Sequence, residues 1–184
     1  MIFDLETIPV DNLEPMIVNE LDAISMESFG GGAWKKAGLQ PLNIKKLLGL
    51  PGVTLFVGKS SALNRICGFA IGTRLTSTSR ERFGLSNLDD TDSAYYPQDG
   101  DYHLTWRAVL PIYRRAGLGS ALTEVRVQYA KDQGAINVLG ETIGMNIGTI
   151  AMHHCMGFKV YWRSFHLSRS GLFERCYFRK QFFC

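Results

Sequence analysis

Residues 107–120 constrain the fold more than any other stretch of the chain, because they join a strand to a helix through a short loop with two glycines. Residues 102–110 are rich in aromatic and β-branched side chains, which predicts a strand. Apolar residues then recur at helical spacing, which predicts a helix over 117–133 with Gly134 as its left-handed cap. The segment is therefore a strand, a tight loop and a helix start.

This loop has the chemistry of an anion-binding site. A helix start presents N–H groups without intrahelical partners and the positive end of the helix dipole. Gly117 and Gly119 have no Cβ, so an anion can approach the backbone closely. Arg114 and Arg115 add positive charge beside these amides. The loop predicts a site for a phosphorylated ligand, most simply a pyrophosphate.

The length and composition favour one ordinary globular domain over residues 1–184. The chain is 46% hydrophobic and 20% charged, and its net charge of +3 is too small to argue for nucleic-acid binding by itself. Its four cysteines form no Cys-x-x-Cys pair, so neither a metal site nor a redox pair is expected. Acidic residues near the N-terminus do not fit a signal peptide, and no apolar run is long enough for a membrane span. We expect a cytoplasmic protein with free thiols.

The remaining patterning predicts a mixed α/β fold with seven strands, in the order β-α-α-β-β-β-α-β-α-β-β. The expected strands are 2–8, 53–57, 66–74, 102–110, 135–141, 158–167 and 175–183. The expected helices are 15–28, 42–48, 117–133 and 146–156. Residues 75–101 show no regular pattern, and five aspartates between 89 and 101 predict a solvated acidic segment or, alternatively, an acidic rim that attracts a cationic amine.

Two nucleotide-binding motifs compete for the glycine-containing loop. A Walker A loop ends in Gly-Lys-Ser/Thr, which is missing here. A Rossmann fingerprint needs a third glycine where this chain has Leu122, and it is expected near the start of an alternating strand–helix series. This loop instead lies two-thirds along the chain, behind strands that are predicted to be antiparallel.

A third motif fits better. The run Arg114-Arg115-Ala116-Gly117-Leu118-Gly119 resembles the Arg/Gln-x-x-Gly-x-Gly signature of the GNAT superfamily of N-acetyltransferases. Members of that family commonly have Asn, then Tyr, then Gly-Phe downstream, and here Asn146, His153 and Gly157-Phe158 stand at that spacing. The element order also resembles the family's mixed, splayed sheet of about seven strands flanked by helices.

The resemblance implies that acetyl-CoA is the co-substrate. The amides of the loop would hold its pyrophosphate, and the backbone of the preceding strand end would pair with the pantetheine arm. Asn146 would bond the pantetheine amides, although an asparagine at a helix start is also an ordinary N-cap. The implied acetyl-CoA residues are Ala108, Val109, Leu110, Arg114, Arg115, Ala116, Gly117, Leu118, Gly119, Ser120 and Asn146.

The resemblance also implies two residues for proton transfer. Glu141 ends a predicted strand five positions before Asn146, where N-acetyltransferases of the ribosomal-protein alanine type place a general base. Burial would raise the pKa of such a carboxylate toward neutrality. His153 stands where the family usually has a tyrosine acid, and a neutral imidazole is a poor proton donor at pH 7. Both residues also have ordinary structural explanations, as a solvated strand-end acid and a half-buried helical histidine.

The predicted function is acetyl transfer from acetyl-CoA to a primary amine by direct attack, with a protein N-terminus or lysine favoured over a small molecule. Two alternatives are a non-catalytic acyl-CoA-binding module and a dinucleotide-binding redox protein. A stripe of basic and aromatic residues over 159–180 fits single-stranded nucleic acid less well than two strands of a sheet. No membrane partner or metal is expected, and no pattern specifies an oligomeric state.

Overall fold

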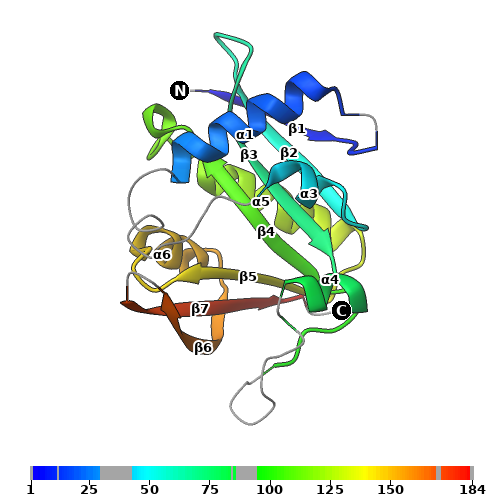
Figure 1. Cartoon of the computed structure of the whole chain (residues 1–184), viewed down its shortest axis with the longest axis vertical. Helices are drawn as coiled ribbons and strands as arrows, with labels where there is room; N and C mark the ends of the chain where they lie inside the picture. Colours follow the sequence, from blue (N-terminus) through cyan, green and yellow to red (C-terminus); the bar gives the residue numbers. More distant parts are fainter. Residues whose placement is uncertain are drawn as a thin grey trace.

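The computed structural model describes residues 2–11, 13–29, 43–83, 85, 95–168 and 171–182. Within them one seven-stranded sheet has the order β1-β2-β3-β4-β5-β7-β6 (Figure 1). Its only parallel pair is β4 with β5, and all other neighbours are antiparallel. The strands are β1 (Phe3–Ile8), β2 (Val53–Ser60), β3 (Arg65–Arg74), β4 (Tyr102–Val109), β5 (Asn137–Ile143), β6 (Lys159–Ser168) and β7 (Gly171–Gln181).

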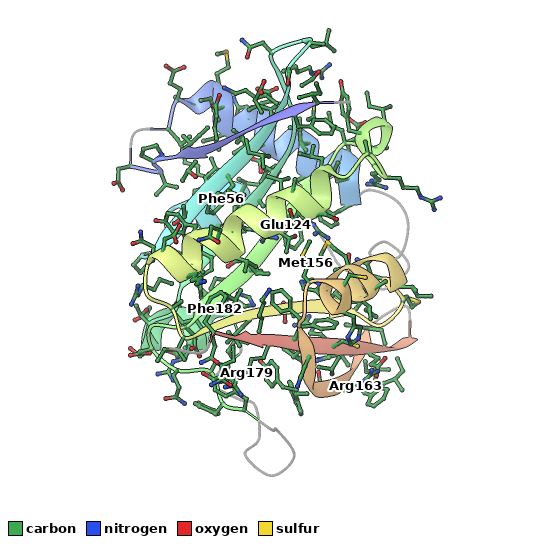
Figure 2. All side chains as sticks on the ribbon, turned by 180° about the vertical axis from the view of Figure 1, so that it is seen from behind. Phe56, Glu124, Met156, Arg163, Arg179 and Phe182 are labelled. Atoms are coloured by element: carbon green, nitrogen blue, oxygen red, sulfur yellow. The ribbon has the colours of Figure 1, made fainter. Side chains whose placement is uncertain are left out.

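Helices cover both faces of this sheet. The helices α1 (Pro15–Phe29) and α3 (Ile44–Leu48) lie on the face turned toward the viewer in Figure 1, which we call the α1 face. The helices α5 (Leu118–Asp132) and α6 (Ile147–Cys155) lie on the opposite face, the α5 face, as the reverse view shows (Figure 2). The mixed α/β fold predicted from the sequence is therefore confirmed, with every expected strand present.

The structure has two short helical elements that the sequence did not predict. The helix α4 (Ser77–Arg82) and the 3₁₀ turn η2 (Pro111–Tyr113) lie where no helix was expected. Thr76 caps α4 through a reciprocal capping box with Ser79, so side-chain hydrogen bonds rather than an apolar stripe begin this helix. The glycine-rich segment 30–34 lies outside the described residues.

The sheet splits at its parallel pair. The ladder between β4 and β5 consists of Tyr102↔Val138, His103↔Leu139 and Leu104↔Gly140. Beyond these pairs both strands continue without pairing with each other. The carboxyl ends of these two strands therefore diverge, as Figure 1 shows. Such a gap leaves backbone groups of both strands available to a ligand.

A β-bulge in β4 lies beside this gap. Between the pairs Ile71↔Trp106 and Thr73↔His103, β4 has one residue more than β3. The extra residue changes which side chains share a face. Trp106 packs on Phe29 of α1, while Arg107 extends to α5 on the other face. Neighbours such as these lie on opposite faces in any strand, and the effect of the bulge is seen in Tyr102, which lies four residues before Trp106 yet packs against Tyr129 of α5.

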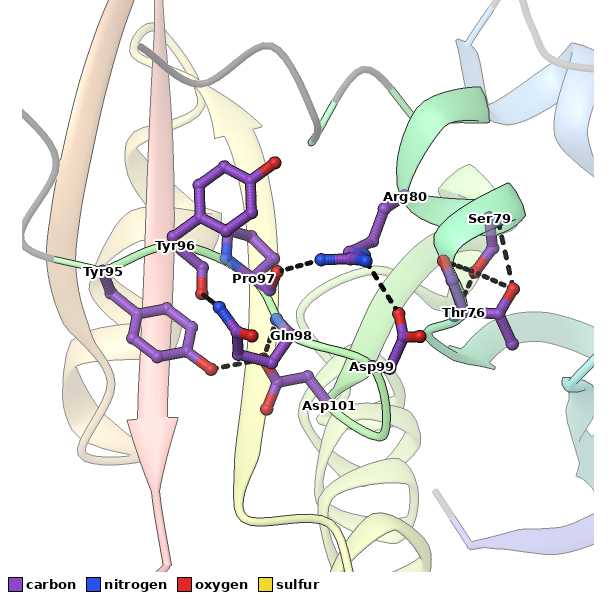
Figure 3. A network of polar contacts seen from close by, with 9 residues as sticks. All are labelled: Thr76, Ser79, Arg80, Tyr95, Tyr96, Pro97, Gln98, Asp99 and Asp101. Atoms are coloured by element: carbon purple, nitrogen blue, oxygen red, sulfur yellow. Dashed lines mark hydrogen bonds and ion pairs between the residues drawn. The ribbon is translucent and has the colours of Figure 1, made fainter. Parts of the chain in front are cut away.

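Segment 95–101 is held against the sheet by polar contacts (Figure 3). The buried Asp101 carboxylate accepts hydrogen bonds from the Tyr95 hydroxyl, from Gln98 N at 2.8 Å and from Asn137 Nδ2 at 2.8 Å. Asp99 forms an ion pair with Arg80 at 2.9 Å. The prediction of a solvated acidic segment is therefore wrong for Asp101, which is buried with fixed partners, whereas Asp99 is exposed as expected. The aspartates at 89, 90 and 92 lie outside the described residues.

Candidate active site

A cavity of about 690 Å³ occupies the gap between β4 and β5. Its lining combines β4, β5, the ends of α1 and α4, the starts of α5 and α6, and Arg175 of β7. Most residues expected from the sequence line it: Ala108, Val109, Arg114, Arg115, Gly119, Glu141, Asn146 and His153. Leu110, Ala116, Gly117, Leu118 and Ser120 are not part of the lining, and the Leu110 and Leu118 side chains are buried in the core.

The loop before α5 presents a row of unused amides. In the described part of the chain, no hydrogen bond uses the backbone N–H groups of residues 115–120. Arg115 and Gly117 have φ angles of 60° and 88°, which place both in the left-handed region. Alternation of such residues with ordinary ones turns successive N–H groups toward one side and forms an anion-binding nest. With the positive end of the α5 dipole behind it, this loop is suited to a pyrophosphate.

Arg114 does not point its charge freely toward this nest. Its Nε donates to Val109 O at 3.3 Å and its Nη2 donates to Ser28 O at 2.8 Å. The Ser28 hydroxyl also donates to Val109 O at 3.0 Å. Arg114 thus ties the end of β4 to the end of α1, a contact that sequence reasoning missed.

The backbone that faces the gap belongs to Arg107 and Val109. Leu110 N donates to Cys67 O of β3, and backbone groups alternate sides along a strand. The N–H and C=O of Ala108 therefore face β3, although the sequence suggested that they pair with a ligand. The Val109 carbonyl already accepts two hydrogen bonds, so the Val109 N–H is the gap-facing group of this residue that remains for a ligand.

Arg107 links three elements behind the gap. Its Nη1 donates to Gly119 O at 2.9 Å and to Thr123 Oγ1 at 2.7 Å of α5, and its Nη2 donates to Thr149 Oγ1 of α6 at 3.2 Å. Burial lowers the pKa of Arg107 to about 10, so the group stays protonated at neutral pH. In the sequence this arginine is only one polar residue of a predicted strand, and no pattern indicates that it links β4 to α5 and α6.

Glu141 lies on the α1 face of β5, directly opposite Tyr177 of β7. Burial raises the pKa of Glu141, and the neighbouring Arg175 guanidinium opposes that rise. The two side chains form an ion pair at 3.4 Å, and each keeps about a quarter of its surface exposed. A carboxylate with a raised pKa in the lining of a cavity has the properties of a general base.

His153 lies on the other face, behind β5. Its ring stacks on Phe178 with a centroid distance of 4.8 Å, and its Nδ1 lies 2.8 Å from Thr149 O. Burial lowers the pKa of His153 to about 4. The neutral ring donates its Nδ1 proton to that carbonyl, so Nε2 has no proton to give. This arrangement favours the structural role that the sequence left open over the role of an acid.

The Asn146 side chain caps α6. Its Oδ1 accepts from Thr149 N at 3.4 Å, and its Nδ2 donates to Thr142 Oγ1 at 3.2 Å. Its position in the cavity lining still leaves it beside the gap. The ordinary N-cap role is therefore present in the structure, and it does not exclude contact with a ligand.

His103 is a buried residue of the cavity lining that sequence reasoning missed. It is 2% exposed, and its Nε2 has no hydrogen-bond partner among the described residues. Burial, with the nearby Arg126 guanidinium, lowers the pKa of His103 to about 3. The ring packs against Phe83, just after α4, at a centroid distance of 5.1 Å.

The two buried histidines predict a loss of stability in acid. Each is neutral when folded and is protonated below about pH 6.5 when unfolded, so the unfolded chain binds more protons there. The free energy of unfolding should fall as the pH drops from 6.5 toward the folded-state values, by about 2 kcal/mol for each histidine at pH 5. Urea titrations at pH 7.5 and 5.0 measure this change in the free energy of unfolding. The variants His103→Gln and His153→Gln should each lack the contribution of one histidine to it. Equal pH dependence in all three proteins would contradict the prediction.

A family model for the GNAT acetyltransferases matches residues 20–158, which include the loop, the gap and both proton-transfer candidates. The chain belongs to the GNAT acetyltransferase family. It is therefore an acetyltransferase, and the family resemblance noted in the sequence is confirmed. No curated protein sequence matches the chain.

Solved structures agree with this assignment at the level of the fold. Arabidopsis thaliana NAA60 in complex with acetyl-CoA has a TM-score of 0.69 at 16% identity, over 98% of each chain. The ribosomal-protein-S18-alanine N-acetyltransferase of Escherichia coli has a TM-score of 0.67 at 16% identity, over 98% of this chain and 94% of that one. A nourseothricin acetyltransferase has a TM-score of 0.50 at 18% identity, over 71% and 66%.

In the ranges that the structure covers, no three His, Cys, Asp or Glu side chains are grouped to hold a metal ion. None of the helices described is long and apolar enough to cross a membrane.

Proposed function

We propose that this GNAT acetyltransferase moves the acetyl group of acetyl-CoA to a primary amine by direct attack, with Glu141 as the general base. One observation supports this most strongly. The row of free amides of residues 115–120 borders the cavity through Arg115 and Gly119, and the raised-pKa carboxylate of Glu141 lines the same cavity from the α1 face of the sheet. Acetyl-CoA would enter along the α5 face, and the amine would arrive from the α1 face.

The chain's own groups have separate roles in this proposal. Acetyl-CoA supplies a thioester, whose carbonyl carbon the amine attacks. Glu141 takes the proton that the amine gives up, directly or through a water. The gap-facing N–H of Val109 donates to the carbonyl oxygen as it gains negative charge. The C–S bond then breaks, and a thiol that titrates near 8.5 leaves as a thiolate without needing a proton from His153.

The class of the amine acceptor is proposed from the position of one residue, Glu141. The position of Glu141 before Asn146 resembles that in N-acetyltransferases of the ribosomal-protein alanine type, so a protein N-terminus or lysine is favoured over a small amine. The test is release of free thiol from acetyl-CoA in the presence of peptides and small amines. Acceptor-dependent release supports transfer, whereas binding of acetyl-CoA without any release would support a non-catalytic acyl-CoA-binding module.

Gly117→Ala should weaken acetyl-CoA binding, and Gly134→Ala is its matched control. Both glycines have positive φ, 88° and 73°, and a Cβ at either meets no atom within 4 Å. Each substitution should therefore cost a similar strain of about 1–2 kcal/mol. Only Gly117 belongs to the proposed pyrophosphate loop.

Thermal unfolding with and without ligand separates the two effects. Acetyl-CoA at about 100 times its Kd should stabilise the native protein by about 2.7 kcal/mol. Gly134→Ala should keep that increment and Gly117→Ala should lose most of it, while NAD should stabilise none of the proteins. Equal increments in both variants would place the pyrophosphate elsewhere.

A further inference from the structure

The charges that line the cavity are strongly unbalanced. Six arginines line it, and Glu141 is its only carboxylate among the described residues. Two of these arginines serve the fold. Arg107 donates to Gly119 O and to hydroxyl groups, and Arg126 donates to Leu122 O, Ile71 O and Trp106 O. Backbone carbonyl and hydroxyl dipoles therefore stabilise the positive charges of these two arginines.

Two more arginines belong to the end of the cavity that we assign to the pyrophosphate. Arg115 lies within the row of free amides, and Arg114 ties β4 to α1 beside it. This leaves Arg82 and Arg175, which line the cavity from α4 and β7. Both belong to the side from which the acceptor amine would approach Glu141.

These two arginines differ in their pairing, since Arg82 has no ion pair among the described residues and Arg175 has only a loose one with Glu141. Arg175 lies 3.4 Å from Glu141, whereas well-formed charge-assisted pairs are about 2.7–2.9 Å long. The pair Arg163–Glu174, which joins β6 to β7, shows the shorter geometry at 2.6 Å. Arg82 is exposed, and no carboxylate of the described residues lies within ion-pair distance of it.

We propose that the acceptor carries a carboxylate a few bonds from its amine, with Arg175 and Arg82 binding the carboxylate while Glu141 faces the amine. This inference rests on the proposed acetyl transfer and narrows its substrate. A guanidinium binds a carboxylate through paired N–H donors, so the two arginines orient the acceptor as well as attract it. An acceptor that carries positive charge and no carboxylate would face two guanidinium groups and only one carboxylate, so the cavity would repel it. The same chemistry is found in a free amino acid and in a peptide with an acidic first or second residue.

The test compares acceptors that differ in one charge. Initial rates of thiol release give kcat/KM for glycine, β-alanine and 4-aminobutyrate against their amides. A second series compares the peptides Ala-Asp-Gly-Gly and Asp-Ala-Gly-Gly with their asparagine counterparts, all amidated at the C-terminus. We expect the acid to be preferred at least about tenfold in one series or both. Preference only among free amino acids identifies a small-molecule acceptor, and preference only among peptides identifies an acidic N-terminus.

Variants link the preference to the two arginines. Arg82→Gln and Arg175→Gln should each reduce the acid-to-amide ratio of kcat/KM by about fivefold or more, mainly through KM for the acid. Arg65→Gln is the matched control, because Arg65 is exposed at the β2–β3 turn and is not part of the cavity. It should leave the ratio unchanged.

The outcomes separate this inference from the proposal beneath it. Transfer with equal rates for acid and amide, or with a preference for the amide, overturns the carboxylate assignment and leaves acetyl transfer standing. A ratio that the Arg82 and Arg175 substitutions do not change overturns it as well. If acetyl-CoA binds but no acceptor of any charge releases thiol, the proposed transfer itself fails.

Discussion

Glu141→Gln should lower kcat by roughly 100-fold or more, with little change in acetyl-CoA binding. The amide has nearly the same size as the carboxylate but does not take a proton from the attacking amine. Glu141 lies on the α1 face, away from the loop expected to hold the pyrophosphate, so the two sites should respond separately. Thiol release measures the rate, and thermal unfolding with acetyl-CoA measures the binding.

The control for this substitution is Glu124→Gln, which removes an exposed carboxylate of α5 outside the cavity (Figure 2). Its rate should equal that of the native protein. The pH profile gives a second readout, because a base must be deprotonated and activity should fall as the pH drops through the raised pKa of Glu141. In Arg175→Gln the opposing guanidinium is gone, so the acidic limb should move to higher pH. An unchanged rate in Glu141→Gln would remove this carboxylate from the mechanism.

Gly72→Ala should destabilise the protein by about 3 kcal/mol or more. A Cβ at Gly72 would overlap the phenol ring of Tyr102, at its hydroxyl oxygen and two of its carbons. That ring is 1% exposed and packs against Tyr129 of α5 at a centroid distance of 5.9 Å. Since a rigid aromatic side chain in a filled core has little room to move, β3 or β4 has to shift instead.

The matched control is Gly148→Ala in α6, where a Cβ meets no atom within 4 Å. This change should be neutral or should stabilise by up to about 1 kcal/mol, because alanine loses less backbone entropy than glycine on folding. Urea unfolding without ligand measures both. If Gly72→Ala retained native stability, the packing of Tyr102 against β3 would be wrong.

The parts of the fold that depend on local pattern were predictable from the sequence. Apolar alternation located the strands, and Gly134, which was expected to be a left-handed helix cap, has the positive φ that this requires. The start of β7 was predicted at Arg175, yet the strand begins at Gly171. The residues before Arg175 pair with β6, and that pairing adds four residues to the strand beyond its own pattern.

Features that depend on distant partners were not predictable. Asp101 lies in a polar stretch and was expected in solvent, but Asn137 of β5, 36 residues away, donates a hydrogen bond to its carboxylate. Arg107 and His103 alternate with apolar residues as ordinary strand residues do. The burial of His103 and the half-buried position of Arg107 follow from the bulge in β4 and from the helices packed on each side, which no local sequence pattern indicates.

The short ladder between β4 and β5 has a mechanical consequence. Only the pairs from Tyr102↔Val138 to Leu104↔Gly140 join the antiparallel unit β1–β4 to the unit β5–β7 within the sheet. The pantetheine arm of acetyl-CoA, hydrogen-bonded to both diverging strands, would connect the two units where the sheet itself does not. Loading the donor would then stiffen the whole protein and not only the walls of its binding site, so that substrate occupancy and resistance to unfolding rise together.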